Sequence, residues 1–177
     1  SLEGLYSFDS SKTKIIWNGF KTTEKIQVTG QFLEFSSSRQ GRSYDSLEEL
    51  VDGLDFVIYT FSSESGDPVR DLNLKDYFFK QLTENFNLSG NLGLPTGNLI
   101  PVSFNTLLGK KTVYLEYVFK NGLIEIKGKI DIGVDLGGAL AFDSIHEKCK
   151  QLHTGGDGVS KTWSEVEVLV KVPILRN

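Results

Sequence analysis

Three side chains of types that bind transition metals lie close together in the sequence, at His146, Cys149 and His153. Zinc prefers imidazole nitrogen and thiolate sulfur, and these spacings would place all three on one face of a helix. On a single helix, however, His146 and His153 lie about 10.5 Å apart along the axis. That is too far for one ion whose ligands bind at about 2.0–2.3 Å. Only Cys149 and His153 could share an ion, so we expect a helix that packs a small apolar cysteine and no metal site.

Sequence motifs of catalysis are missing. The chain has neither G-x-S-x-G nor G-x-G-x-x-G, and Gly109-Lys110-Lys111-Thr112 lacks the upstream glycine of a P-loop. An acyl-transfer triad would depend on His146 or His153, and no serine stands in a suitable context. We interpret Arg70-Asp71 as a packing or solvated arginine beside a helix-start aspartate, not as a functional ion pair. The sequence therefore favours a protein that is not an enzyme and has no cofactor.

The composition narrows the class of protein further. Nineteen Lys and Arg against 23 Asp and Glu give a net charge of −4, which argues against nucleic acid as a partner. No apolar stretch approaches the roughly 18 residues of a membrane span, and Ser1 to Gly4 does not begin a signal peptide. Cys149 is the only cysteine, so no internal disulfide forms. A length of 177 residues suits one domain, and we expect 1–177 to be a single domain.

The elements that position these side chains are mostly strands, because apolar residues alternate with polar ones. The clearest case predicts one strand over 123–134, and 165–172 repeats the pattern with four valines. The segments 13–20 and 28–32 alternate in the same way, which places Ile15 and Trp17 on the face opposite Lys14 and Asn18. Further strands are predicted at 54–61, 84–92, 98–107 and 112–120. Asn121-Gly122 is a strong two-residue hairpin turn.

Three helix starts interrupt the strands. Ser46-Leu47-Glu48-Glu49 is a capping box before a helix over 47–51. Asp67-Pro68 supplies an N-cap and a first-turn proline for a helix that ends near Phe79. Ser144-Ile145-His146-Glu147 is a second capping box, for a helix that ends by Gly155-Gly156. These helices are expected to lie around the strands.

Eight long strands with one apolar face each must hide that face in a sandwich or a barrel. Strands of nearly ten residues span about 33 Å, or roughly 25 Å along the axis of a barrel with strands tilted by about 40°. The expected fold is therefore all-β, a closed eight-stranded antiparallel barrel with two or three short peripheral helices. Its interior could be filled by side chains or hold one ligand. Gly19, Gly30 and Gly128 on the inner face either leave room for a ligand or mark bends.

Several motifs between residue 5 and about residue 79 carry a resemblance to a known family. Val28-Thr29-Gly30-Gln31-Phe32 fits a V-x-G-x-F strand. Arg70-Asp71 fits an R-D-…-L-…-F-F signature, completed by Leu74 and by Phe78-Phe79. The opening strands contribute Leu5-Tyr6-Ser7-Phe8-Asp9, Ser11 and Ile15-Ile16-Trp17-Asn18-Gly19-Phe20-Lys21. Together these motifs resemble the YceI-like family of polyisoprenoid-binding proteins. Two features depart from the pattern: the Y-P strand opening after Phe79 is missing, and 135–163 is an insertion.

The resemblance implies a lipocalin-like barrel, periplasmic or secreted and often dimeric, that holds an isoprenoid or similar long apolar lipid. The expected function is a non-catalytic binding or carrier protein. The alternatives are an enzyme that modifies a lipid or small molecule in the same cavity, or an interaction module with a filled core. The expected ligand-binding residues are Ile15, Trp17, Val28, Phe32, Phe78, Phe79, Ile126, Ile130, Val166 and Val168.

Two further expectations come from strand parity. Trp17 should point into the barrel with Ile15, whereas Trp163 shares the parity of Glu165 and should lie outside or at a rim. Leu33 and Leu123 should be exposed on otherwise polar strand faces, which together with the resemblance suggests a homodimer.

Overall fold

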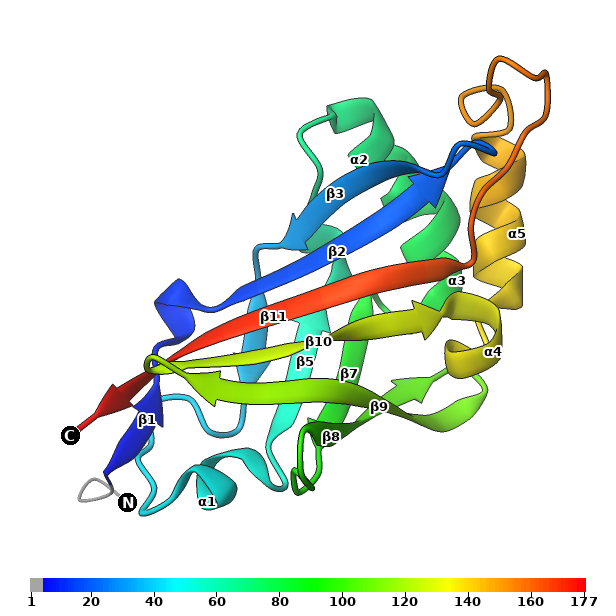
Figure 1. Ribbon diagram of the computed structural model, residues 1–177. Coiled ribbons are helices and arrows are strands. Elements are labelled where there is room, and N and C mark those ends of the chain that lie inside the picture. The colour runs from blue at the N-terminus through cyan, green and yellow to red at the C-terminus, as the bar shows by residue number, and fades with distance from the viewer. Residues whose placement is uncertain (1–4) are drawn as a thin grey trace.

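The computed structural model describes residues 5–177. Its strands are β1 (Tyr6–Phe8), β2 (Lys14–Lys21), β3 (Ile26–Phe32), β4 (Phe35–Ser37), β5 (Asp55–Tyr59), β6 (Ser63–Glu64), β7 (Asn87–Leu92), β8 (Leu99–Thr106), β9 (Gly109–Lys120), β10 (Leu123–Asp131) and β11 (Glu165–Arg176). They form one antiparallel sheet in the order β4-β5-β7-β8-β9-β10-β11-β2-β3-β6, with β1 paired to the end of β11. The sheet is strongly curled (Figure 1). The all-β class is confirmed.

The long strands share one register of inward and outward faces. Trp17 of β2 lies opposite Val168 of β11 and Gly30 of β3, and Ile15 lies opposite Val170 and Phe32. Because side chains alternate across a strand, residues directly opposite one another share a face of the sheet. The inner face predicted for the segments 13–20, 28–32 and 165–172 is therefore confirmed.

The predicted strand over 123–134 was too long at its C-terminal end. β10 stops at Asp131, whose carboxylate accepts hydrogen bonds from the backbone N–H groups of Gly133 and Val134 at 3.0 and 2.9 Å. This N-cap turns the chain into helix α4 (Ile132–Leu136). Ile132 is consequently buried and Val134 exposed, although strict alternation would have put them on the same face.

The Asn121-Gly122 hairpin is confirmed. Both residues have positive φ, 56° and 73°, as a type I′ turn requires. The turn pairs Lys120 of β9 with Leu123 of β10 and so sets the register between these two strands.

Two of the three predicted helix starts are correct. Ser46 caps α1 (Leu47–Val51), and Asp67 caps α2 (Pro68–Leu74) by accepting from Val69 and Arg70 N–H. The chain then continues through a single π-helical turn, η3 (Lys75–Phe79), into α3 (Lys80–Leu82). Two 3-10 turns, η1 (Ser10–Lys12) and η2 (Thr60–Ser62), complete the elements.

The third helix start was wrong. Helix α5 runs over Ala139–Lys148, so Ser144 lies inside it and does not cap it. The cause is Gly137, which takes φ +64° and ends α4, so that α5 follows at once. The helix also ends before the predicted Gly155-Gly156, since Cys149 already has non-helical dihedrals.

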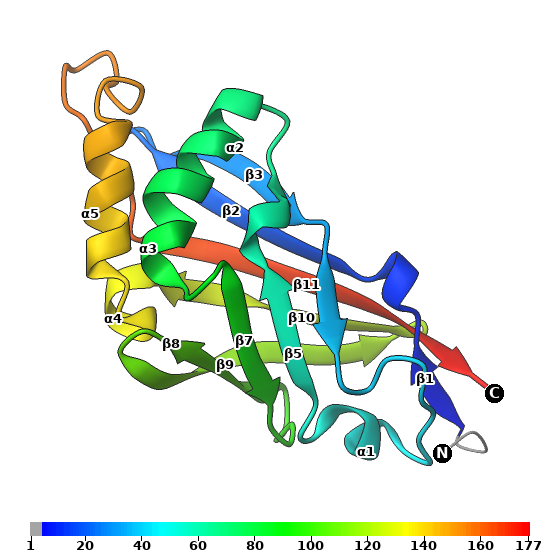
Figure 2. The same cartoon turned by 180° about the vertical axis from the view of Figure 1, so that it is seen from behind.

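Helices α2, α3, α4 and α5 lie towards one end of the curled sheet, whereas α1 lies near β1 at the other end (Figures 1 and 2). α4 and α5 follow the C-terminal end of β10. The C-terminal end of α5 lies close to the hairpin between β2 and β3, and α5 lies against η3 and α3 (Figures 1 and 2). The buried core lies inside the curl, where inner side chains of β8, β9 and β10 meet α3, α4 and α5. Fully burying an aliphatic side chain contributes about 1.5–3 kcal/mol, so this core holds the curl and the helices together.

Candidate ligand-binding cavity

A cavity of about 320 Å³ lies inside the curl. Small-molecule sites commonly occupy about 300–1,000 Å³, so the interior is hollow enough for a ligand and is not filled by side chains. Each of the residues expected to bind a ligand lines this cavity. They are Ile15, Trp17, Val28, Phe32, Phe78, Phe79, Ile126, Ile130, Val166 and Val168. The structure thus brings the whole predicted set together.

The indole of Trp17 crosses the inner face of the neighbouring strand. Its Nε1–H donates a hydrogen bond to Ser63 Oγ at 3.0 Å. A Cβ added to Gly30, the residue paired with Trp17, would lie 2.2 Å from Cζ2 of the ring. The space above Gly30 is therefore occupied by Trp17, and a Cβ on Gly128 would likewise meet the Leu115 side chain at 2.8 Å. These glycines make room for neighbouring side chains rather than for a ligand.

The π-helical turn presents two consecutive phenylalanines to the cavity. Phe79 packs edge-on against Phe32 with ring centroids 5.6 Å apart, and Phe78 packs against Phe79 at 5.1 Å. A π turn is wider than an α turn and is frequent at functional sites. Asp67 and Pro68 begin the helix that carries both rings, so a local capping signal positions part of the cavity wall.

Among residues 5–177, the charged side chains that line the cavity are Lys21 and Arg70, and no Asp or Glu of this range lines it. Arg70 is already hydrogen-bonded: its Nε donates to Ser65 Oγ at 2.8 Å, and a terminal nitrogen donates to Ser65 O at 3.1 Å. Asp71 accepts from Ser65 N and Oγ at 2.9 and 2.6 Å. Both members of Arg70-Asp71 thus hold the loop before α2, which agrees with the packing interpretation.

A second group of polar lining residues, among them His153 and Thr162, lies where α5 and the segment after it meet β2. Thr13, before the start of β2, and Ser37, at the end of β4, also line the cavity. His153 and His146 both place Nδ1 against the hydroxyl of Thr162, at 2.5 and 2.8 Å respectively. The expectation that these two histidines lie too far apart was wrong, because the helix ends at Lys148 and the chain folds back before His153. Among residues 5–177, no three His, Cys, Asp or Glu side chains converge as a metal site would need.

Burial perturbs two titratable groups at this end, His153 and Cys149. Desolvation, together with the positive charges of Lys21 and His146, lowers the pKa of His153 to about 4. Desolvation raises the pKa of the buried Cys149 thiol, opposed by the charges of Lys148 and Lys21. At neutral pH His153 is therefore an uncharged imidazole, and Cys149 is a small apolar side chain in the cavity wall, as expected.

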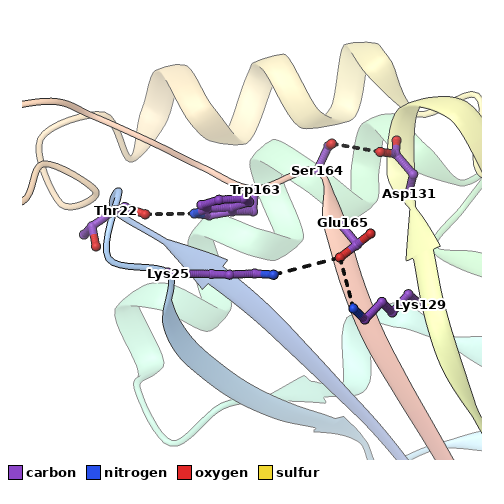
Figure 3. Close-up of polar contacts among 7 residues, drawn as sticks. All are labelled: Thr22, Lys25, Lys129, Asp131, Trp163, Ser164 and Glu165. Atoms are coloured by element: carbon purple, nitrogen blue, oxygen red, sulfur yellow. Dashed lines mark hydrogen bonds and ion pairs between the residues drawn. The ribbon is translucent and has the colours of Figure 1, made fainter.

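Trp163 anchors the segment that carries Thr162. Its Nε1–H donates to Thr22 O at 2.8 Å (Figure 3). The ammonium groups of Lys25 and Lys161 lie 5.0 and 4.9 Å from its ring centroid. The ring is half-buried and lies at the end of the cavity, which fits the rim position expected from its parity. Next to it, Ser164 Oγ donates to Asp131 Oδ2 at 3.0 Å, which ties β11 to the end of β10.

Thr22 is the strained residue at this anchor. It is buried, has φ +63°, and its Oγ1 has no hydrogen-bond partner among the described residues. A β-branched residue in the left-handed region costs on the order of 1–3 kcal/mol. Two long-range hydrogen bonds hold it there, from Thr22 N to Lys161 O and from Trp163 Nε1 to Thr22 O.

Sequence reasoning missed several cavity residues at this end, among them Lys21, Phe142, Ile145 and Thr162. The parity of β2 could have indicated Lys21, because it shares the face of Ile15 and Trp17. Nothing local marks Thr162, which reaches the cavity only through the fold of the inserted segment. None of the described helices is long and apolar enough to cross a membrane.

The fold is similar to several solved structures. A polyisoprenoid-binding domain from Saccharophagus degradans, implicated in plant cell wall breakdown, is 13% identical with a TM-score of 0.63, over 99% of this chain and 100% of that one. BcnA of Burkholderia cenocepacia is 14% identical with a TM-score of 0.53, over 95% and 99% of the two chains. A variant of Campylobacter jejuni YceI is 18% identical with a TM-score of 0.51, over 80% and 84%.

The sequence comparisons add nothing to this, since no family model and no curated protein matches the chain. At identities of 13–18% the shared property is the fold. This property agrees with the motifs between residues 5 and 79, which predicted it from the sequence. The chain has the fold of the YceI-like, polyisoprenoid-binding proteins.

Proposed function

We propose that this chain is a non-catalytic binding or carrier protein that holds one long apolar lipid, of isoprenoid type, inside a closed eight-stranded barrel. The observation that carries the proposal is the hollow interior: about 320 Å³, walled mostly by aliphatic and aromatic side chains and by no carboxylate of the described residues. The similarity to a polyisoprenoid-binding domain supports the choice of ligand class.

Closure of the barrel is supported by the pairing at the ends of the sheet. β4 follows β3 after two residues, and β6 follows β5 after the turn η2. β3 pairs with β6 and β4 with β5, and Tyr59 N–H donates to Glu34 O at 3.1 Å between these ladders. If β3 with β4 and β5 with β6 each count as one bent strand, eight strands form a circuit. Such a barrel has an interior suited to one small ligand.

The energetics allow tight binding without polar contacts. Burying a twenty-carbon chain at about 0.8 kcal/mol per CH₂ contributes roughly 16 kcal/mol before costs. Association and ordering cost about 4–15 kcal/mol. The cavity volume lies at the low end of the range for ligand sites, so we expect one chain rather than several.

The proposal extends to the whole chain. Residues 1–177 act as one domain, which the pairing of β1 with the end of β11 supports. A periplasmic or secreted location and a homodimer follow from the family resemblance.

The test is an organic extract of the purified protein, analysed by mass spectrometry, followed by titration of the stripped protein with a polyprenyl lipid. We expect one lipid per chain and saturable binding. Two adjacent residues of β11 form a matched pair for this test: Val168 lines the cavity, and Leu169 lies on the other face. Val168→Gln should weaken binding about tenfold or more, and Leu169→Gln should bind like wild type. An empty extract with no binding to any long-chain lipid would contradict the proposal.

An enzyme acting in the same cavity is the second candidate, and one observation favours it. The Thr162 hydroxyl lies within hydrogen-bond distance of two imidazoles, and a hydroxyl beside a base is the arrangement of an activated nucleophile. In this case the same hydroxyl serves both rings, and neither histidine bonds a carboxylate in the described part of the chain. Hydrolysis of a long-chain ester by wild type that is lost in Thr162→Val would favour the enzyme.

A further inference from the structure

One end of the cavity carries a cluster of polar side chains, and it is built by the inserted segment together with β2. Lys21, Cys149, His153 and Thr162 line the cavity there, next to Trp163. Arg70 of α2, Thr13 and Ser37 also line the cavity, outside this cluster. The inner faces of β10 and β11 supply only aliphatic side chains to the lining. A ligand with a polar head and an apolar tail can therefore place its head at this cluster and its tail along these two strands.

Lys21 brings a positive charge to this end. It lies on the inward face of β2 with Ile15 and Trp17, and it is half-buried. None of the ion pairs among residues 5–177 includes it, so no carboxylate oxygen of this part lies within 4.0 Å of its Nζ. No Asp or Glu of these described residues lines the cavity either. An anionic group in this part of the cavity would give the ammonium a partner, and hydrogen bonds with an ionised donor or acceptor are the stronger ones.

His153 brings a directed hydrogen-bonding group to the same place. A hydroxyl has one proton to donate and accepts as well, so Thr162 can accept from His146 Nδ1–H and donate to His153 Nδ1. This assignment satisfies both observed contacts. It leaves a proton on His153 Nε2, which has no partner among the described residues. A neutral imidazole with a free N–H donates to an anion without adding a second buried charge.

The inserted segment holds these groups in place before any ligand arrives. Lys161 N donates to His153 O at 3.1 Å, and Ser160 Oγ donates to Lys150 O at 2.6 Å. Thr23 Oγ1 donates to Asp157 Oδ2 at 2.6 Å, which joins the segment to the β2–β3 hairpin. Trp163 and Thr22 complete the connection (Figure 3). A site held in this way loses little conformational entropy on binding.

We propose that this end of the cavity is a head-group site, which selects single-tailed lipids with an anionic head, either a carboxylate or a phosphate monoester. Lys21 Nζ supplies the charge, His153 Nε2–H donates a hydrogen bond to an anionic oxygen, and the tail extends along the apolar walls. The site rests on the proposed function and deepens it, because it names the chemistry of the ligand's head.

The experiment compares matched pairs of lipids on stripped protein: geranylgeranyl phosphate with geranylgeraniol, and palmitate with hexadecanol. A charge-assisted hydrogen bond corresponds to about tenfold to hundredfold in affinity. We expect the anionic member of at least one pair to bind tighter by that factor. Lys21→Met should abolish the difference, because it should weaken the binding of the anionic lipid and leave the binding of the alcohol unchanged. Lys14→Met, on the outward face of the same strand, should preserve the difference. The pair that shows the preference identifies carboxylate or phosphate as the head.

The failures of the two proposals are distinguishable. If neither alcohols nor anions bind, the lipid-binding function itself is wrong. If each alcohol binds as tightly as its anion in wild type, the head-group site is wrong and lipid binding stands. The comparison in wild type needs no variant, so it decides the charge requirement even where Lys21→Met does not fold. His153→Phe should reduce the preference for the anion, and an undiminished preference would contradict the role of His153.

Discussion

At the scale of single residues, Trp17 lines the cavity and can serve as a fluorescent probe of ligand binding. Its indole lines the wall and is fixed by the hydrogen bond to Ser63. We expect its fluorescence emission to shift when the ligand is stripped and to return when a polyprenyl lipid is added. The response should be reduced in Trp17→Phe, in which Trp163 is the only tryptophan that still lines the cavity, and it should survive in Trp163→Phe. A response that follows Trp163 alone would place the lipid at the cluster of polar side chains without contact to Trp17.

His153 predicts a pH dependence of stability. Burial lowers its pKa to about 4 in the folded chain, from an ordinary value of 6.5. The unfolded chain therefore binds more protons between these values, so the free energy of unfolding rises with pH through this window. Acidification from pH 7 towards pH 4.5 should cost on the order of 1–2 kcal/mol at this half-buried site.

Urea unfolding at several pH values measures this dependence. His153→Gln should flatten it between pH 4.5 and about pH 6.5. Asp9→Asn serves as a control, because the hydrogen bond from Ser11 lowers the pKa of Asp9 below its ordinary value of 3.8, and its contribution is lost only at still lower pH. An unchanged slope in His153→Gln would show that another group titrates in the window.

At the scale of elements, the N-cap of α2 controls a wall of the cavity. Asp67 Oδ1 accepts from Val69 and Arg70 N–H at 3.0 and 3.2 Å. Asp67→Ala should cost about 1 kcal/mol in the free energy of unfolding. It should also weaken lipid binding, since the same helical run carries Phe78 and Phe79. Asp76→Ala, an exposed acidic residue of that run, is the matched control and should leave both quantities close to wild type. Equal effects of the two variants would rule out the capping explanation.

At the scale of the whole molecule, a lipid that binds only the folded state must stabilise it. Ligand at a hundredfold excess over its Kd contributes about 2.7 kcal/mol, which for a chain of this length raises Tm by roughly 5–11 °C. Thermal unfolding of stripped and reloaded protein measures the shift. Val168→Gln should show a smaller shift than Leu169→Gln at the same lipid concentration. Identical melting with and without lipid would count against a lipid inside the fold.

The oligomeric state is also a property of the whole molecule, and exposed apolar side chains bear on it. Leu33 is 58% exposed, and Phe61 nearby is 48% exposed, next to the hydrogen bond from Leu33 N to Ser62 O. Leu123, in contrast, is half-buried, so it offers less surface than expected. We expect a homodimer by light scattering, and Leu33→Lys should weaken it more than Leu107→Lys on the distant β8–β9 hairpin. A mass near the 19.7 kDa of one chain at high concentration would contradict the dimer.

The sequence by itself determined the features that depend on residues close together in the chain: strand faces, a hairpin turn and two helix caps. Strand alternation placed Trp17, Val28 and Ile126 on the inner face, because a strand has only two faces and burial selects one. Asn121-Gly122 specified its hairpin through positive φ, and Ser46 and Asp67 capped their helices through hydrogen bonds a few residues away. The same reasoning failed at Asp131, where a local cap ended a strand whose apolar pattern continued.

Only the tertiary structure decided the cluster of polar side chains at one end of the cavity. On one helix His146 and His153 cannot meet, yet both contact Thr162, because the chain leaves the helix at Lys148 and returns through the inserted segment. That path depends on bonds between distant residues, such as Trp163 to Thr22, which no local pattern encodes. Strand parity places a side chain on a face, but it does not say whether the space inside is filled. That volume depends on how every inner side chain packs against the others.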